Sequence, residues 1–201
     1  MHRFVVALVV GVATGISLLA PASGTERAPA ALASAAPPAG AAVFASDLGI
    51  YVANLDGTAL KRLTRDGYDA GPVWSPDAKR IAFSRAVGWS VAVMVMNADG
   101  AGSRRIGWGE GPAWSPDDTR IVFVDGPGVE DVSSGKTIVP APAGFTIAKL
   151  DGSGSRRVGV GEVFSVSWSP DGKRIAFTVR RDDWIHLYRL ATGKARTLAR
   201  I

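Results

Sequence analysis

Few side chains in this 201-residue chain are of the types that carry out catalysis, and their scarcity limits the chemistry open to it. There is no cysteine, which excludes disulfides, thiolate metal sites and cysteine nucleophiles. Of the two histidines only His186 lies beyond residue 40, and the sequence contains no Gly-x-Ser-x-Gly motif. A serine triad would have to use His186, which we interpret as a strand residue. We therefore expect no catalytic residue, no metal site and no cofactor.

Carboxylates and tryptophans remain as candidates for recognition. Three acids lie a few residues ahead of a recurring tryptophan: Asp69, Glu110 and Glu162. If these places share one face of the fold, their charges would attract a cation or a basic peptide; ordinary solvated loop charge is the alternative. Tryptophan is enriched at binding hot spots, and three tryptophans lie outside the recurring motif: Trp89, Trp108 and Trp184. Packing against a neighbouring repeat is the alternative for these three.

The elements that must position these residues come from an internal repeat. A ten-residue motif, Trp-Ser-Pro-Asp followed by two variable residues and Arg-Ile-x-Phe, occurs at 74–83, 114–123 and 168–177. A second motif alternates with it, an apolar run ending in Asp-Gly or an equivalent pair, at 50–57, 93–100, 145–152 and 187–193. Self-similarity at such a period is the signature of a repeat architecture.

Each motif has a direct structural reading. Ser-Pro-Asp-Gly suits a type I turn whose next residue takes the left-handed conformation and closes a hairpin. Gly172 is ideal at that place and Asp118 tolerates it, whereas Ala78 is strained there. The Ile-x-Phe triplets are short and rich in β-formers, and no apolar pattern at helical spacing follows residue 40. The sequence predicts an all-β fold.

The repeats predict a β-propeller. Each unit supplies four strands: a carries the tryptophan, b the Ile-x-Phe, c runs into Asp-Gly, and d carries a basic pair. Trp74 and Trp114 are spaced as expected for a blade of about 40–45 residues. Units begin near residues 41, 70, 110 and 164, and the first has no tryptophan strand. We expect about four blades of four antiparallel strands, the first blade lacking its inner strand; a closed ring, an open arc and a piece of a larger propeller remain open.

These segments resemble the TolB-type propeller repeat. The run Val-Met-Val-Met-Asn-Ala-Asp-Gly at 93–100 and Lys-Arg-Leu-Thr at 61–64 carry the likeness, which covers residues 43–200. The resemblance implies a propeller that serves as an extracytoplasmic binding scaffold. The separate amino-terminal α/β domain of full-length TolB has no counterpart in this sequence.

The first forty residues read as targeting sequence. A short basic start precedes an uncharged apolar stretch from Phe4 to Ala20 and small residues that suit cleavage. We predict a signal peptide over 1–22, with cleavage as late as 33, an Ala/Pro-rich linker over 23–40 and the propeller domain over 41–201. The location would be extracytoplasmic, secreted, periplasmic or attached to the cell wall, with membrane contact only through an uncleaved signal segment.

The net charge of +5 does not point to nucleic acid, because the basic pairs recur beside turns, where solvated strand ends are expected. The main hypothesis is an exported, non-catalytic scaffold that binds a protein or peptide. The face formed by the d–a and b–c connections would carry the site: Asp69, Trp89, Trp108, Glu110, Glu162 and Trp184. The alternative is a carbohydrate- or small-molecule-active propeller enzyme that uses loop carboxylates. An open arc would in addition favour self-association.

Overall fold

The structure, a computed structural model, describes residues 17–18, 40–46, 49–65, 67–88, 90–126, 144–151, 153–179 and 184–200. These residues form strands joined by turns, with no helix among them. The strands are β1 (Ser17–Leu18), β2 (Ala41–Ser46), β3 (Gly49–Asn54), β4 (Lys61–Arg62), β5 (Asp69–Trp74), β6 (Arg80–Val87), β7 (Ser90–Asn97), β8 (Arg104–Trp114), β9 (Arg120–Asp125), β10 (Gly144–Lys149), β11 (Arg156–Gly159), β12 (Val163–Trp168), β13 (Arg174–Val179), β14 (Trp184–Arg189) and β15 (Lys194–Arg200).

The strands pair antiparallel in chain order and make four blades. Blade 1 is β2–β4, and blade 4 is β12–β15. A seven-stranded sheet between them holds two blades, because the first half of the long strand β8 pairs with β7 and its second half with β9. Blade 2 is therefore β5–β7 with Arg104–Trp108, and blade 3 is Gly109–Trp114 with β9–β11.

The junction inside β8 replaces the d–a loop expected between blades 2 and 3. The chain bends at Gly109, whose φ of 153° is one that side chains rarely adopt. A Cβ on Gly109 would lie 2.1 Å from the carbonyl oxygen of Val124, so the two backbones meet at a distance only glycine allows. Trp108 and Glu110 therefore lie in a strand, on either side of this bend.

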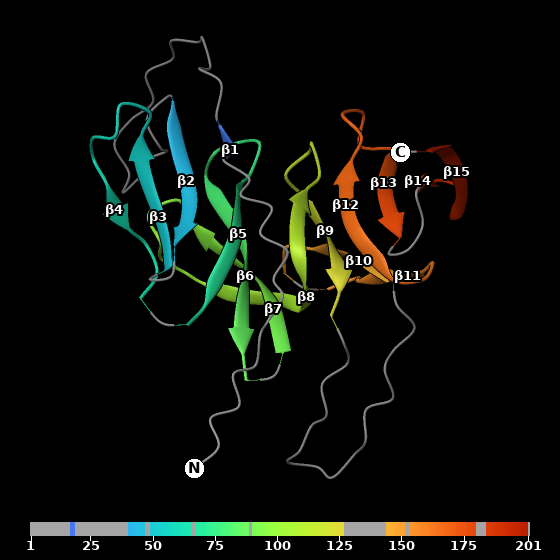
Figure 1. The fold of residues 1–201 in the computed structure, drawn as a ribbon, viewed down its shortest axis with the longest axis horizontal. Coiled ribbons are helices and arrows are strands. Elements are labelled where there is room, and N and C mark those ends of the chain that lie inside the picture. The colour runs from blue at the N-terminus through green and yellow to red at the C-terminus, as the bar shows by residue number, and fades with distance from the viewer. Residues whose placement is uncertain are drawn as a thin grey trace.

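The blades follow one another around an arc (Figure 1), which confirms the predicted all-β propeller. In the part of the chain that the structure describes, neither strand pairing nor a shared core cluster joins blade 1 to blade 4, so the arc is open. Among the described residues, blade 1 has no long inner strand. The two-residue strand β1, which pairs with Ala42 and Val43, takes that place.

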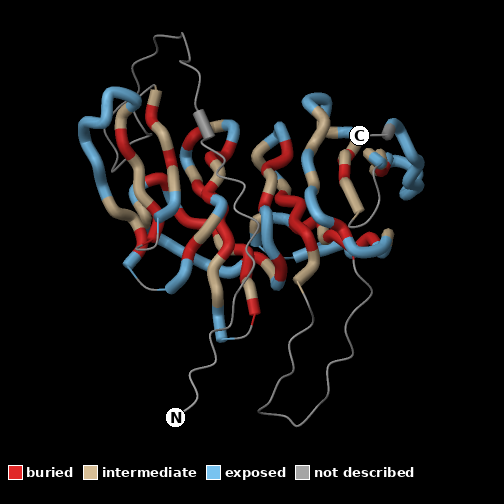
Figure 2. Tube along the Cα trace, in the orientation of Figure 1, coloured by how far each residue is buried: buried red, intermediate tan, exposed pale blue. Residues whose placement is uncertain are grey.

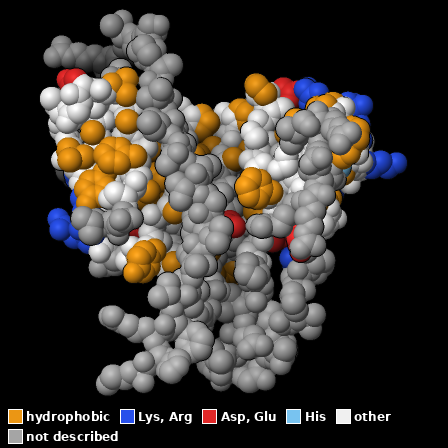
Figure 3. Space-filling view, in the orientation of Figure 1, with side chains coloured by type: hydrophobic (Ala, Val, Ile, Leu, Met, Phe, Trp, Pro, Cys, Tyr) orange, Lys and Arg blue, Asp and Glu red, His pale blue; other side chains and the backbone are white. Residues whose placement is uncertain are grey.

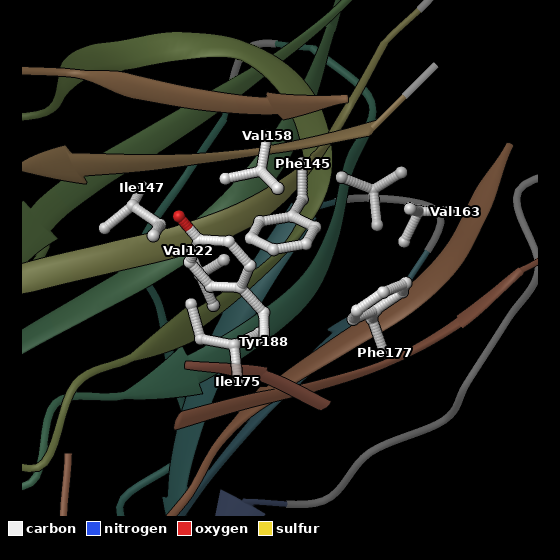
Figure 4. Packing of buried hydrophobic residues seen from close by; sticks show 9 residues of the cluster. Val122, Phe145, Ile147, Val158, Val163, Ile175, Phe177 and Tyr188 are labelled. Carbon is white, nitrogen blue, oxygen red and sulfur yellow. The ribbon is translucent and has the colours of Figure 1, made fainter. Parts of the chain in front are cut away.

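Three apolar clusters hold the arc together, one at each blade–blade contact. The first lies between blades 1 and 2, the second between blades 2 and 3, and the third between blades 3 and 4. Figure 2 shows the buried residues running along the arc, with exposed residues at the turns. In the third cluster Phe145 meets Phe177 with ring centroids 5.4 Å apart and Tyr188 edge-on at 5.6 Å (Figure 4). Aromatic packing of this kind adds about 0.5–1.5 kcal/mol to the burial itself.

The hairpin turns adopt the predicted geometry. Ala78, Asp118 and Gly172 all have positive φ, at 58°, 57° and 65°. Each of their backbone N–H groups donates to the carbonyl of the serine three residues earlier, which closes the turn. The serine hydroxyl then donates to the aspartate of the same motif, as Ser115 does to Asp117 at 2.5 Å. Ser-Pro-Asp is thus a self-contained turn, repeated three times.

Candidate functional site

Asp69 is the first residue of β5, and its carboxylate forms a buried ion pair. Its side chain is fully buried, and the Arg85 guanidinium donates to both carboxylate oxygens, over 2.7 and 2.9 Å. The two residues face each other in the β5–β6 register, so strand pairing itself aligns the fork with the carboxylate. Arg85 also lies over the ring of Phe83, 5.2 Å from its centroid. The charge of Asp69 is neutralised within blade 2.

Trp108 and Glu110 are exposed at the bend of β8. Trp108 is 42% exposed and pairs with Ala92, while Glu110 pairs with Val124. The Arg105 guanidinium lies 4.4 Å from the centroid of the Trp108 ring, a cation–π contact that orders the indole at the surface. An aromatic ring and a carboxylate therefore flank one glycine.

At least one of the same two places is exposed in each neighbouring blade. Counting back six and four residues gives Tyr68 and Ala70 ahead of Trp74, Trp108 and Glu110 ahead of Trp114, and Glu162 and Phe164 ahead of Trp168. Tyr68 is 78% exposed and Phe164, the bulge residue of β12, is 62% exposed. We call the exposed members of this set the entrance row: Tyr68, Trp108, Glu110, Glu162 and Phe164.

The entrance row lies along one face of the arc. Its members precede or begin the first strand of their blades, and repeated blades present equivalent positions on the same side. Antiparallel pairing brings the start of the third strand to that side as well, which places Trp184, 42% exposed at the first position of β14, near the row. Sequence reasoning missed Tyr68 and Phe164, although aligning the residues ahead of each tryptophan would have found them.

Asp125 and Asp69 each have partners that remove their carboxylates from this surface. Asp125, almost buried at the end of β9, accepts from Arg157 at 2.7 Å and from the Thr146 hydroxyl at 2.5 Å. Asp69 is held by Arg85 as described. Trp89 lies outside the described residues. The exposed carboxylates of the predicted site are therefore Glu110 and Glu162.

The turn aspartates are the groups whose acidity the fold changes most clearly. The Ser115 hydroxyl, helped by Thr119 and Arg120, lowers the pKa of Asp117 from 3.8 to about 2. The equivalent hydroxyl of Ser169 lowers the pKa of Asp171. These groups stabilise the turns at the end of the blades where the first strand finishes, away from the entrance row. His186 lies in β14, as expected, with its ring stacked on Phe177 at 5.1 Å.

Two searches of the described residues bear on chemistry and location. No three side chains of the metal-binding types gather closely enough there to hold an ion. Nor does that part of the chain include a helix long and apolar enough to cross a membrane.

Comparison with known proteins places the fold. A scan against protein-family models found no match, and a search of curated proteins found none either. Among solved structures, TolB from Acinetobacter baumannii is 21% identical with a TM-score of 0.58, over 75% of this chain and 37% of that one. A chain of a nidogen/laminin complex is 16% identical with a TM-score of 0.61, over 79% and 59%. An oligogalacturonate lyase in complex with manganese is 14% identical with a TM-score of 0.57, over 76% and 42%.

These similarities establish a TolB-like propeller repeat fold. At such low identity they concern the fold alone. The chain spans between 37% and 59% of the lengths of these three structures, so it corresponds to part of each propeller-containing chain.

Proposed function

We propose that this chain is an exported, non-catalytic propeller scaffold that binds a protein or peptide through the entrance row and Trp184. The observation that carries the proposal is the repeated exposure of an aromatic ring at the same end of three successive blades: Tyr68, Trp108 and Phe164. Large rings held at a surface supply much contact area for little loss of conformational freedom, and they are typical of interface hot spots.

The charges of the row favour a basic or neutral partner. Glu110 and Glu162 are exposed in the row. The basic pairs lie on the outer strands, from which Arg105 contacts the Trp108 ring and offsets part of this negative charge. An extended segment with Lys or Arg and apolar side chains would pair its cations with these carboxylates and stack on the rings. Nucleic acid is not the proposed partner, because the exposed carboxylates of the row would repel its phosphates.

The fold likeness supports this proposal without identifying the partner. TolB-like propellers and a chain of a nidogen/laminin complex share the architecture, and the second belongs to an assembly of proteins. Export rests on the basic start and apolar stretch of the first 22 residues, followed by the Ala/Pro-rich linker. Cleavage would be detected as a mature amino terminus between residues 23 and 34 in protein recovered outside the cytoplasm.

The second candidate is an enzyme acting on a carbohydrate or another small molecule through Glu110 and Glu162. The likeness to an oligogalacturonate lyase that holds manganese favours it. The described residues do not assemble the three or more ligands that a metal of that kind requires. This candidate therefore stands second.

A peptide selection tests the two candidates together. We expect the protein to enrich peptides carrying basic and apolar residues from a random display library. Trp108→Ala and Phe164→Ala should each weaken the binding of a selected peptide about tenfold or more. Leu60→Ala, at an exposed apolar residue in blade 1 outside the row, is the matched control and should change nothing. Failure to select any peptide, together with turnover of an acidic oligosaccharide that Glu110→Gln abolishes, would favour the enzyme instead.

A further inference from the structure

Each blade has two faces, and the strand registers show which positions form them. The leading face packs on the preceding blade: Ile81, Phe83 and Met96 in blade 2 have equivalents in Ile175, Phe177 and Tyr188 of blade 4. The trailing face packs on the following blade. Its residues are Ala82, Val93 and Val95 in blade 2 and Val122, Phe145 and Ile147 in blade 3. Each of the three apolar clusters joins a trailing face to a leading face.

The trailing face of blade 4 keeps the apolar residues of this contact, but no other blade among the described residues covers it. Ala176 and Leu187 pair in the register of Ala82 and Val95, and Ile185 stands in the place of Val93. These three residues are half-exposed, whereas their equivalents in blade 2 are buried. Leu198 is the bulge residue of β15, as Ile106 is of β8, and it is 52% exposed where Ile106 is 8% exposed.

The leading face of blade 1 lies at the other end of the arc, and there too no other blade of the described residues packs on it. Phe44 and Tyr51 pair in the register of Phe83 and Met94. Their rings are stacked 5.8 Å apart and half-buried, whereas Phe83 is fully buried. In Figure 3 hydrophobic side chains gather at the left end over this blade, and a smaller group lies at the right end beside basic side chains.

A polar contact between blades repeats in the same way. Lys61 of blade 1 donates to the carbonyl of Asp99 in blade 2, over 3.0 Å, and Arg104 of blade 2 donates to the carbonyl of Leu150 in blade 3. Both carbonyls belong to the turn that follows the third strand. Arg196 occupies the equivalent register position in blade 4, opposite Leu187, and is exposed. Lys61, Arg104 and Arg196 thus share one register position, from which the first two donate to the following blade.

We propose that a second copy of this chain covers both ends, so that two open arcs close one ring of eight blades. The trailing face of blade 4 of each copy would receive the leading face of blade 1 of the other. A second copy fits because its blade 1 presents the kind of face that trailing faces in this chain contact three times, and because one partner satisfies both ends at once. A half-turn about the ring axis relates the copies and closes the assembly, and eight blades lie within the four to eight that propellers use.

The eight-bladed assembly requires specific contacts between the two copies. Leu187 and Leu198 of one copy would contact Phe44 and Tyr51 of the other, in the manner of Val95 and Ile106 inside the arc. Arg196 would donate to the turn carbonyls at Leu55 or Asp56 of the other copy, since that turn is the equivalent of the one at Asp99. The proposal does not depend on the entrance row, although a closed ring would bring two rows onto one face.

Cross-linking tests the proposal directly, because the chain has no cysteine of its own. Phe44→Cys and Leu187→Cys are introduced into the same full-length chain, which is then oxidised at low concentration and analysed on a denaturing gel. We expect a disulfide-linked dimer. A faster-migrating monomer with an internal disulfide would show that the arc closes on itself, and no cross-link at any concentration would show that the faces do not meet. Either result overturns the proposal.

Solution mass with single variants gives an independent test. Light scattering should show twice the mass of one chain for the protein as exported. Leu198→Asp and Tyr51→Asp should each weaken dimerisation about 100-fold while leaving the melting transition of the arc in place. Mixing the two variants should restore a dimer, because one of its two contacts then holds only wild-type faces. Val87→Asp, at an exposed residue of the β6–β7 hairpin in blade 2, is the control and should stay dimeric. Two results would contradict the eight-bladed assembly: a wild-type protein that is monomeric at about 100 μM, or single variants that both remain dimeric. Trp108→Ala should leave the mass unchanged, which separates this test from that of peptide binding.

Discussion

Arg120 of blade 3 lies over the ring of Trp168 in blade 4, with its guanidinium carbon 4.8 Å from the ring centroid. Arg80 of blade 2 makes the same contact with Trp114 of blade 3, at 5.5 Å. The arginine and the tryptophan of the ten-residue motif therefore act between blades: the arginine of one repeat stacks on the tryptophan of the next. This relationship explains why the two residue types recur at fixed places in each unit.

Replacing Arg120, which stacks on Trp168, should destabilise the protein more than replacing Arg174. Arg120→Gln is expected to lower the free energy of unfolding by about 1 kcal/mol, the usual worth of a partly desolvated cation–π contact. Arg174 is the control, because it makes the same ion pair to the aspartate of its own turn but lies in the last blade of the arc. Urea unfolding of Arg120→Gln and Arg174→Gln gives the comparison. Equal losses would mean that the ion pair and not the ring accounts for the effect.

The turn of blade 2 can be improved by a single change. Ala78 has a φ of 58°, a conformation in which its Cβ is strained, whereas Gly172 fills the equivalent place without strain. Ala78→Gly should raise the free energy of unfolding by about 0.5–1 kcal/mol, and Gly172→Ala should lower it by a similar amount. Thermal melting of the two variants checks the pair. A destabilised Ala78→Gly protein would show that the buried methyl group matters more than the backbone strain.

Stability should fall at low pH because of the turn aspartates. The pKa of Asp117 is about 2 in the folded state, against 3.8 for the unconstrained group, so the folded state binds its proton less readily. The stabilisation is complete above about pH 4 and is lost as the pH falls toward about 2. Urea midpoints at about pH 6, 4 and 2.5 should decline, and Asp117→Asn should decline less between the last two. The same decline in the variant would remove Asp117 from the explanation.

Asp69 is expected to matter for folding more than for ligand binding. Asp69→Asn removes the negative charge that the largely buried Arg85 guanidinium contacts at 2.7 Å, and we expect it to cost about 2–4 kcal/mol in unfolding free energy. In a double-mutant cycle with Arg85→Met, the combined loss should be smaller than the sum of the single losses. The selected peptide should bind Asp69→Asn as it binds the wild type at temperatures where both are folded. A stable variant that no longer binds would return Asp69 to the recognition surface.

The blades were predictable from sequence because each residue of the turn motif has a local physical reason to stand where it does. Proline sets the turn, the serine–aspartate pair satisfies it, and positions 78, 118 and 172 take the positive φ. Closure was not predictable. It depends on curvature summed over three blade contacts, and no single residue pattern encodes that sum.

The exposure of the candidate residues was predicted in part. Glu110, Glu162, Trp108 and Trp184 are exposed at the surface, as the predicted recognition role requires, and that role itself stays a prediction. The ion pair of Asp69 with Arg85 could not be predicted from the sequence, because only the pairing of β5 with β6 brings the two residues opposite each other. The strand that runs through the junction of blades 2 and 3 was read as a loop, since glycine on both sides of Glu110 resembles loop sequence.

Amide hydrogen exchange with and without a selected basic peptide tests the central claim, binding through the entrance row, most directly. The account predicts added protection at the starts of the first strands, in residues 107–111 and 161–165, and none at the turns over 54–58 and 97–101 on the opposite side of the blades. Protection confined to those turns, with the entrance row unchanged, would contradict it.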